Sequence, residues 1–249
     1  MAPSVAPPTR WPSACRANSA VQRLAIWKNA GGCENYGVAA AWGTSTTDRV
    51  APRTAPSSPW VRRAVDALAH ELRLHHEPTA EHSHRLANLS RKVAHRLGLD
   101  PLDIVEVELV AVLHDVGKLA VDPEILDYPG PLGPRERAIM ARHTIEGEEL
   151  LARTAGLEHL GETVRATHER FDGTGYPDGL AGDGIPLAAR IVACADSFDA
   201  MTSSRAYRRA LSFEEACTRL RGGAGSQFDP AVVAVLLGVV LEHAAQVPA

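Results

Sequence analysis

The run from Leu113 to Lys118 reads Leu-His-Asp-Val-Gly-Lys and places a histidine directly beside an aspartate. Apolar residues at helical spacing precede this pair, so we expect His114 and Asp115 to be partly buried where a helix ends. A buried aspartate is costly unless it is paired or binds a cation, and imidazole beside carboxylate suits zinc, iron or manganese. The alternative for the dipeptide alone is a capped helix end with a solvated pair.

A glycine-containing loop follows a second histidine. The stretch from His168 to Pro177 reads His-Glu-Arg-Phe-Asp-Gly-Thr-Gly-Tyr-Pro. Glycines spaced in this way can expose backbone N–H groups to a phosphate, and Tyr176 offers a flat face and a hydroxyl to a base or ribose. Taken alone, the same stretch could be an ordinary surface turn.

Two more polar blocks follow in the chain. Asp196 lies within the apolar helical pattern of residues 191–198 and falls on or near its buried face. Arg205, Arg208 and Arg209 come after that helix and form a local basic patch that could bind a charged oxygen. The four blocks together combine candidate metal ligands with groups that could bind a phosphate or another charged oxygen.

These blocks resemble the HD-GYP family, a bacterial branch of the HD phosphohydrolases. The resemblance runs from about Val61 to Leu241, and it rests on the following stretches: His82-Ser83, His114-Asp115-Val116-Gly117-Lys118, His143 with Gly147, His168-Glu169-Arg170, Asp172-Gly173-Thr174-Gly175-Tyr176-Pro177, Asp196, Met201 to Arg208, and Gln227-Phe228-Asp229-Pro230.

The resemblance implies an all-α fold, an HD-domain helical bundle with a metal centre between its helices. It further implies a metal-dependent phosphodiesterase that hydrolyses the bacterial second messenger cyclic di-GMP to pGpG or GMP. The family uses two or three divalent ions, usually iron or manganese. Its loop is also a contact surface for diguanylate cyclases, so such a signalling protein is a plausible partner.

The resemblance also assigns roles to individual residues. Asp115 would bridge two ions, and Lys118, the second catalytic residue, would contact the bridging hydroxide or the scissile phosphate. Metal binding would fall to His82, His114, Asp115, His143, His168 and Asp196. Substrate binding would fall to Gly175, Tyr176, Arg205 and Arg208.

Two positions depart from the family pattern. Thr167 stands where a second histidine is usual, and His168 cannot replace it because neighbours on a helix point about 100° apart. Some three-metal members carry a glutamate four residues before the first ligand, where this chain has Pro78. We therefore expect two divalent ions at most, or only one. A phosphohydrolase acting on another nucleotide and a catalytically degenerate module that binds nucleotide or a partner remain alternatives.

Composition indicates a soluble cytoplasmic enzyme. The chain has 249 residues, 45% of them hydrophobic and 22% charged, which is ordinary for a globular domain. Its net charge of −4 argues against general DNA binding. No apolar run reaches the roughly 20 residues of a membrane span. The four cysteines lack CxxC spacing, which fits a reducing compartment.

The chain divides near Pro59. Residues 1–58 are rich in Ala, Pro, Ser and Thr without periodicity, so we expect a disordered leader or a misassigned start of translation. Residues 59–249 form the HD-GYP phosphohydrolase domain in this interpretation. Helical patterns are expected over 61–72, 86–97, 132–155, 158–170 and 230–241. Further helices are expected from Pro101 to the His114 region, around Asp196 after a turn at 183–186, and from a capped start at Ser212.

Overall fold

The computed structural model describes residues 58–203 and 209–246. The expected leader, apart from Ser58, and the basic residues Arg205 and Arg208 lie outside the described residues. The elements are α2 (Pro59–His75), α3 (Glu77–Arg96), α4 (Pro101–Leu113), η2 (Val116–Ala120), α5 (Pro123–Leu126), α6 (Pro134–Ala141), α7 (His143–Ala152), η3 (Glu158–Leu160), α8 (Gly161–Arg165), η4 (Ala166–His168), η5 (Gly182–Gly184), α9 (Leu187–Thr202), α10 (Phe213–Gly223) and α11 (Pro230–Gln246).

Local capping signals start several of these helices where the sequence predicts them. The Asp100 carboxylate accepts hydrogen bonds from the backbone N–H groups of Leu102 and Asp103, and it thereby caps α4. Ser212 and Glu215 form a reciprocal capping box at the start of α10. These bonds satisfy backbone donors that a helix start leaves without partners, so the boundaries follow from short-range sequence alone.

The expected single helical stretch over 132–155 is two helices, because the chain breaks between α6 and α7 at Arg142. Two side chains form hydrogen bonds with backbone carbonyl groups at the break. The Nδ1–H of His143 donates to the carbonyl of Met140 at 2.7 Å, and the hydroxyl of Thr144 donates to that of Ala141 at 3.2 Å. The expected helix over 158–170 is likewise divided into η3, α8 and η4. His143 is thereby the first residue of α7, and His168 is the last residue of η4.

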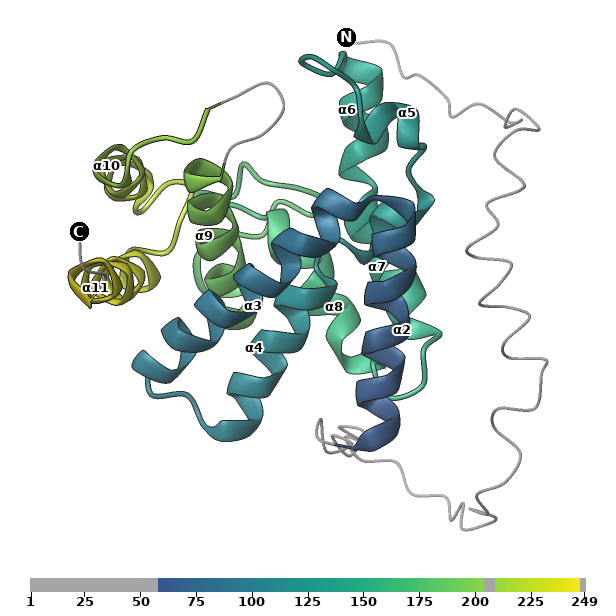
Figure 1. The fold of residues 1–249 in the computed structure, drawn as a ribbon, viewed down its shortest axis with the longest axis horizontal. Helices are drawn as coiled ribbons and strands as arrows, with labels where there is room; N and C mark the ends of the chain where they lie inside the picture. The colour runs from purple at the N-terminus through teal and green to yellow at the C-terminus, as the bar shows by residue number, and fades with distance from the viewer. Residues whose placement is uncertain (1–57, 204–208, 247–249) are drawn as a thin grey trace, which may run out of the picture. The chain divides into compact units, whose positions relative to one another are not determined.

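The core lies where α3, α4 and α9 pack against one another (Figure 1). Helices α10 and α11 pack against α9 on one side of this group, while α2 contacts α3 and α4 on the other. Val93, Ile191, Leu220 and Leu236 are fully buried at these contacts. Each such side chain contributes roughly 1.5–3 kcal/mol by leaving water. This apolar packing holds the three helices that carry much of the polar site.

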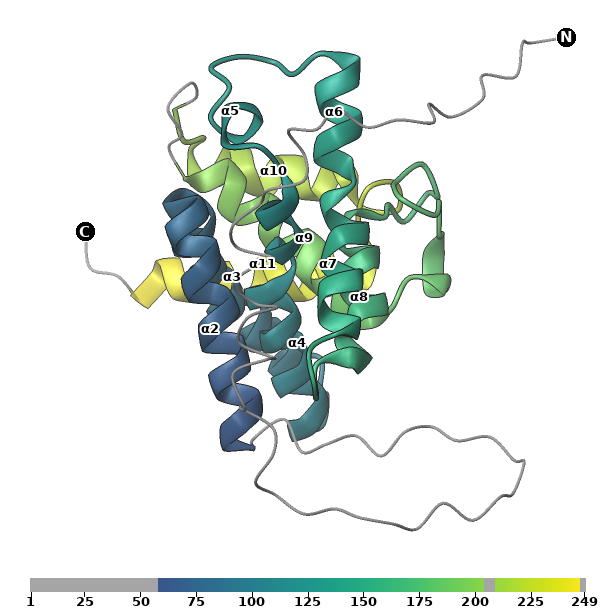
Figure 2. The same cartoon turned by 90° about the vertical axis from the view of Figure 1, so that its right-hand side faces the viewer.

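The fold is all-α, as the sequence predicts. Across residues 58–203 and 209–246 the only extended pairings are two isolated bridges, Asp172 with Ala181 and Ala224 with Phe228. Figure 2, turned from the first view, shows α5 and α6 together at one end of α7. Within the described part of the chain, every helix is too short or too polar to cross a bilayer.

Candidate metal centre

The six residues expected to bind metal gather into two groups of three. We call His82, His114 and Asp196 the first ligand group, and Asp115, His143 and His168 the second ligand group. Within each group, one nitrogen or oxygen from every residue lies within 4.8 Å of the others. Segments more than a hundred residues apart in sequence supply the first group, so only the fold brings these side chains together.

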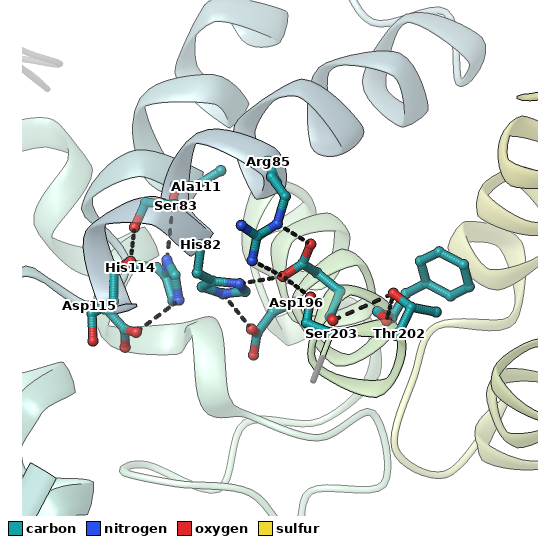
Figure 3. Close-up of polar contacts among 12 residues, drawn as sticks. His82, Ser83, Arg85, Ala111, His114, Asp115, Asp196, Thr202 and Ser203 are labelled. Atoms are coloured by element: carbon teal, nitrogen blue, oxygen red, sulfur yellow. Dashed lines mark hydrogen bonds and ion pairs between the residues drawn. The ribbon is translucent and has the colours of Figure 1, made fainter. Parts of the chain in front are cut away.

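Three packed helices position the first ligand group. His82 comes from α3, Asp196 comes from α9, and His114 is the residue directly after α4. Figure 3 shows His82 between the His114–Asp115 pair and Asp196. The rings of His82 and His114 meet edge to face, with their centroids 5.6 Å apart. The buried packing of the helices therefore fixes the spacing of these ligands.

Asp115 connects the two groups. The helix α4 ends at Leu113 and the chain tightens into η2, which turns the carboxylate of Asp115 toward both histidines. Its Oδ2 lies 3.3 Å from Nε2 of His114, and its Oδ1 lies 3.3 Å from Nε2 of His143. The Lys118 ammonium donates to Oδ2 at 2.5 Å. A carboxylate placed in this way can serve a ligand position in each group.

Gly117 lets η2 approach α7. A Cβ atom at this position would lie 1.9 Å from the carbonyl oxygen of His143 and 2.5 Å from the backbone nitrogen of Gly147. No side chain fits between the two segments. The absence of a side chain at Gly117 thus allows Asp115 and His143 to face each other.

Backbone hydrogen bonds orient two of the imidazoles. The Nδ1–H of His114 donates to the carbonyl of Ala111 at 2.9 Å, as that of His143 does to Met140. With Nδ1–H used in this way, Nε2 is the nitrogen that each ring has left for a metal ion. Both Nε2 atoms point toward Asp115, which is the arrangement that metal-binding histidines require.

The second ligand group has the electrostatics of a cation site. Asp115 Oδ1, His143 Nε2 and His168 Nε2 are buried and have no hydrogen-bond partner among the described residues. Burial and the nearby His143 lower the pKa of His168 to about 3, so its ring is neutral. Burial alone would raise the pKa of Asp115, but His114 and Lys118 hold it well below its usual value. Neutral nitrogens beside a buried anion fit a divalent metal ion.

The first ligand group is arranged differently, because its central histidine pairs with two carboxylates. His82 lies between two carboxylates, with Nε2 2.8 Å from Asp196 and Nδ1 2.6 Å from Asp199. Burial alone would lower the pKa of His82, but hydrogen bonds to these two carboxylates raise it to about 9. Arg85 donates to both oxygens of Asp199. The donor set suits a metal that replaces the proton on Nε2.

Sequence reasoning missed Asp199 and Arg85. A usable signal was present, since Asp199 follows Asp196 by three residues and Arg85 follows His82 by three. Residues at this spacing share a helix face. A carboxylate that accepts from the second nitrogen of a ligand histidine is a recurrent feature of metal sites.

Thr167 contributes to neither group. Its side chain is 2% exposed, and its hydroxyl donates to the carbonyl of Val164 at 2.8 Å. A cavity of about 60 Å³ lies beside it, lined by Asp196, Gln227 and Phe228 among others. The departure from the family pattern therefore leaves a small space next to the first ligand group.

The glycine loop is attached to the second ligand group through Glu169. One carboxylate oxygen of Glu169 accepts from the N–H groups of Asp178 at 2.6 Å and Gly179 at 3.0 Å. The ring of Tyr176 stacks on His168 with centroids 5.3 Å apart and planes 7° apart. Burial, with Asp115 and Asp196 nearby, raises the pKa of Tyr176 to about 12. The loop thus buttresses a ligand histidine.

Gly175 has a packing role that its predicted role did not include. A Cβ atom there would lie 2.3 Å from the backbone nitrogen of Arg170. The glycine therefore permits the loop to fold back on the segment that follows His168. Substrate binding by Gly175 and Tyr176 stays a prediction, as it does for Arg205 and Arg208 outside the described residues.

A cavity of about 650 Å³ opens onto the centre. Five of the six expected ligands line it, all except His143. Its wall also includes Arg85, Lys118 and His76, which are basic, and Asp127, Tyr128 and Met140. The cavity is large enough for a nucleotide-sized molecule and exposes the ligands to it.

A sequence model of the HD domain family matches residues 66–232. The chain is 39% identical over 178 residues to the cyclic di-GMP phosphodiesterase response regulator RpfG of Xanthomonas campestris pv. campestris, covering 71% of this chain and 47% of that protein. It is 37% identical over 178 residues to the 3'3'-cGAMP-specific phosphodiesterase 2 of Vibrio cholerae, covering 71% of this chain and 34% of that protein.

A solved structure shares the fold. The Bd1817 protein of Bdellovibrio bacteriovorus, described as an HDG"Y"P protein, superimposes with a TM-score of 0.54 at 22% identity, covering 64% of this chain and 51% of that one. This chain spans about half or less of the length of the curated relatives named above.

Proposed function

Since the chain belongs to the HD domain family, and to its HD-GYP branch, we propose that it is a metal-dependent phosphodiesterase that hydrolyses cyclic di-GMP to pGpG or GMP. The phosphodiesterase domain would be residues 59–249. The observation that carries the proposal is the pair of ligand groups joined by Asp115 beside a cavity of about 650 Å³. Relatives named cyclic di-GMP phosphodiesterases support the substrate.

The metal ions would be held by the two ligand groups, and iron or manganese suits their nitrogen and carboxylate donors. When bound, such ions activate water and neutralise the charge of a phosphodiester. Each group offers three protein ligands, which agrees with two ions at most. Thr167 offers its hydroxyl to a backbone carbonyl, so it would not add a ligand.

The residues of the chain would have separate roles in holding the metal ions and in binding the phosphates. Asp115 would hold one carboxylate oxygen toward each ligand group. Lys118 lines the cavity beside Asp115, where its ammonium would stabilise charge that grows on the phosphate oxygens toward the transition state. Arg85 lines the same cavity and would attract the second phosphate of a cyclic dinucleotide. Arg205 and Arg208 keep their predicted role in phosphate binding.

A second substrate has support from the relatives. The 3'3'-cGAMP-specific phosphodiesterases of Vibrio cholerae are 37–38% identical over the matched residues, close to the value for RpfG. A metal centre cleaves a phosphodiester without reading its bases, so 3'3'-cGAMP is the alternative substrate. A diguanylate cyclase as protein partner stays a prediction.

The test measures metal content and turnover on the full chain purified without oxygen. Cyclic di-GMP and 3'3'-cGAMP are offered separately and in competition, and the products are resolved by chromatography. The control carries His114→Ala and Asp115→Ala, which removes one residue from each ligand group.

We expect bound metal with cyclic di-GMP turnover in the natural chain, and a loss of roughly a thousandfold or more in the control. Preferential cleavage of 3'3'-cGAMP in competition would favour the alternative substrate. Binding of cyclic di-GMP without cleavage, in a chain that carries metal, would contradict the proposal and indicate a binding module.

A further inference from the structure

Two adjacent residues on the wall of the large cavity have no part in the metal centre. Asp127 and Tyr128 follow α5 directly, and both line the cavity that exposes the ligand groups. Tyr128 is 52% exposed, so a large part of its side chain is open to solvent. The Asp127 side chain is 69% exposed. Both can therefore reach a molecule in the cavity.

Tyr128 offers an aromatic surface that the glycine loop does not. The expected base-binding aromatic, Tyr176, already stacks on His168 with planes 7° apart, so one of its faces is covered. Tyr128 and Met140 lie on the cavity wall instead. An exposed aromatic ring and a polarisable thioether on the wall of one cavity are suited to a flat heterocycle.

Asp127 is held in place by a neighbouring histidine. Nε2 of His76 lies 3.3 Å from Oδ1 of Asp127, and Nδ1 of His76 shares a 2.7 Å hydrogen bond with the hydroxyl of Thr79. His76 and Lys118 line the same cavity. The Asp127 carboxylate is thus an oriented acceptor on the side of the cavity where Lys118 lies.

We propose that Tyr128 stacks on a purine base of the substrate and that Asp127 selects guanine by accepting hydrogen bonds from its Watson–Crick edge. This inference rests on the proposed function, because it names the base that the same site reads. Guanine presents two adjacent donors, N1–H and the N2 amino group, which match the two oxygens of a carboxylate. Adenine presents an acceptor at N1, whose lone pair a carboxylate repels.

The test is calorimetric binding of GMP, AMP and inorganic phosphate to the full metal-loaded chain, which needs no turnover. The variants are Tyr128→Ala, Tyr128→Phe and Asp127→Asn. Glu124→Gln serves as the matched control, since Glu124 lies in α5 nearby and is exposed outside the cavity wall.

We expect the natural chain to bind GMP more tightly than AMP. Tyr128→Ala should weaken binding of both nucleotides by roughly 5- to 100-fold, and Tyr128→Phe should restore it. Asp127→Asn should reduce the preference for GMP by a similar factor, because GMP loses an acceptor for its two donors and AMP loses a repulsive neighbour at N1. Phosphate binding should be equal in all variants.

Equal GMP and AMP binding in the natural chain would overturn the guanine role of Asp127. Unchanged GMP binding in Tyr128→Ala, or an equal loss of phosphate binding, would overturn the stacking role. Failure to hydrolyse cyclic di-GMP while GMP is bound selectively would contradict the proposed function alone.

Discussion

The two ligand groups are joined by Asp115, but their buried polar atoms have different partners. In the first group, His82 carries a proton between Asp196 and Asp199, and its pKa is raised to about 9. In the second group, burial keeps His168 neutral, with its pKa lowered to about 3, and three polar atoms have no hydrogen-bond partner among the described residues. The histidine of the first group is hydrogen-bonded at both ring nitrogens, whereas the second group has two ring nitrogens without a hydrogen bond.

This difference implies that the two ligand groups should bind a metal ion with different affinities. A cation entering the first group must displace a proton, so its affinity falls as the proton becomes harder to remove. A cation entering the second group displaces nothing and satisfies buried acceptors that are costly to leave unpaired. We therefore expect the second group to bind its ion more tightly.

Asp199→Asn tests the comparison with the largest expected effect. The amide keeps an acceptor for the Nδ1–H of His82 but removes the charge that orients and polarises the ring. Loss of this charge also makes the His82 proton easier to remove, but the loss of ring orientation and basicity is the larger effect. Metal affinity of the first group should therefore fall by about 10- to 100-fold, while that of the second group is unchanged. Titration with manganese, followed by electron paramagnetic resonance, separates the two sites.

A matched control for this variant is Asp183→Asn, which removes an exposed carboxylate paired with Arg190 away from the centre. It should leave both affinities as they are. An equal weakening of both sites in Asp199→Asn would mean that the groups are not independent and would break the comparison.

Thr167→His should sharpen the comparison by adding a ligand. The cavity of about 60 Å³ beside Thr167 borders Asp196, so an imidazole placed there would approach the first ligand group. We expect metal affinity of that group to rise by about tenfold, which corresponds to roughly 1.4 kcal/mol. Isothermal titration with manganese measures the change.

Thr167→Leu is the control of similar bulk, and it also loses the hydrogen bond to Val164 without offering a nitrogen. Both variants should first be checked for helix content by circular dichroism. If Thr167→Leu raised the affinity as much as Thr167→His, packing rather than ligation would be the cause.

The site was predictable from sequence where a residue's role is signalled by its neighbours. The His114–Asp115 pair follows a recognisable helix end, and the caps Asp100 and Ser212 act within three residues. The partnership of His82 with Asp199 was not predicted, because it spans 117 residues and depends on how α3 packs against α9. Short-range hydrogen bonds can be read locally, whereas packing decides long-range ones.

The break at Arg142 illustrates the same limit within the fold. Periodicity continues through residues 132–155, and nothing in it marks where α6 ends. The end becomes visible only when His143 and Thr144 bond the carbonyls of Met140 and Ala141. The histidine that breaks the helix is one of the expected ligands.

Asp178→Asn tests an ion pair in the glycine loop, which is attached to the second ligand group through Glu169. Of the three substitutions, it should have the smallest effect, and that effect is on thermal stability. Hydrogen bonds from Arg165 lower the pKa of Asp178 below its usual value. A depressed folded-state pKa stabilises the fold above the unfolded pKa of about 3.9, and this contribution is lost as pH falls through the folded value. The pair is partly exposed, so screening keeps the contribution at about 1 kcal/mol or less.

Thermal unfolding from about pH 7 to about pH 3 measures this contribution. The melting temperature of the variant should lie slightly below that of the natural chain at neutral pH, and the two should converge in acid. A gap that widens in acid would contradict the assignment.

For protein engineering, the close approach at Gly117 divides the glycines into replaceable and irreplaceable positions. A methyl group at Gly117 would collide with backbone atoms of His143 and Gly147, which cannot rotate away as a side chain can. Gly184 and Gly222 have open space around the same position. A saturation library selected for function should therefore retain glycine at position 117 and accept many residues at positions 184 and 222. Sequence diversity in such a library is better placed at positions like 184 and 222 than at 117.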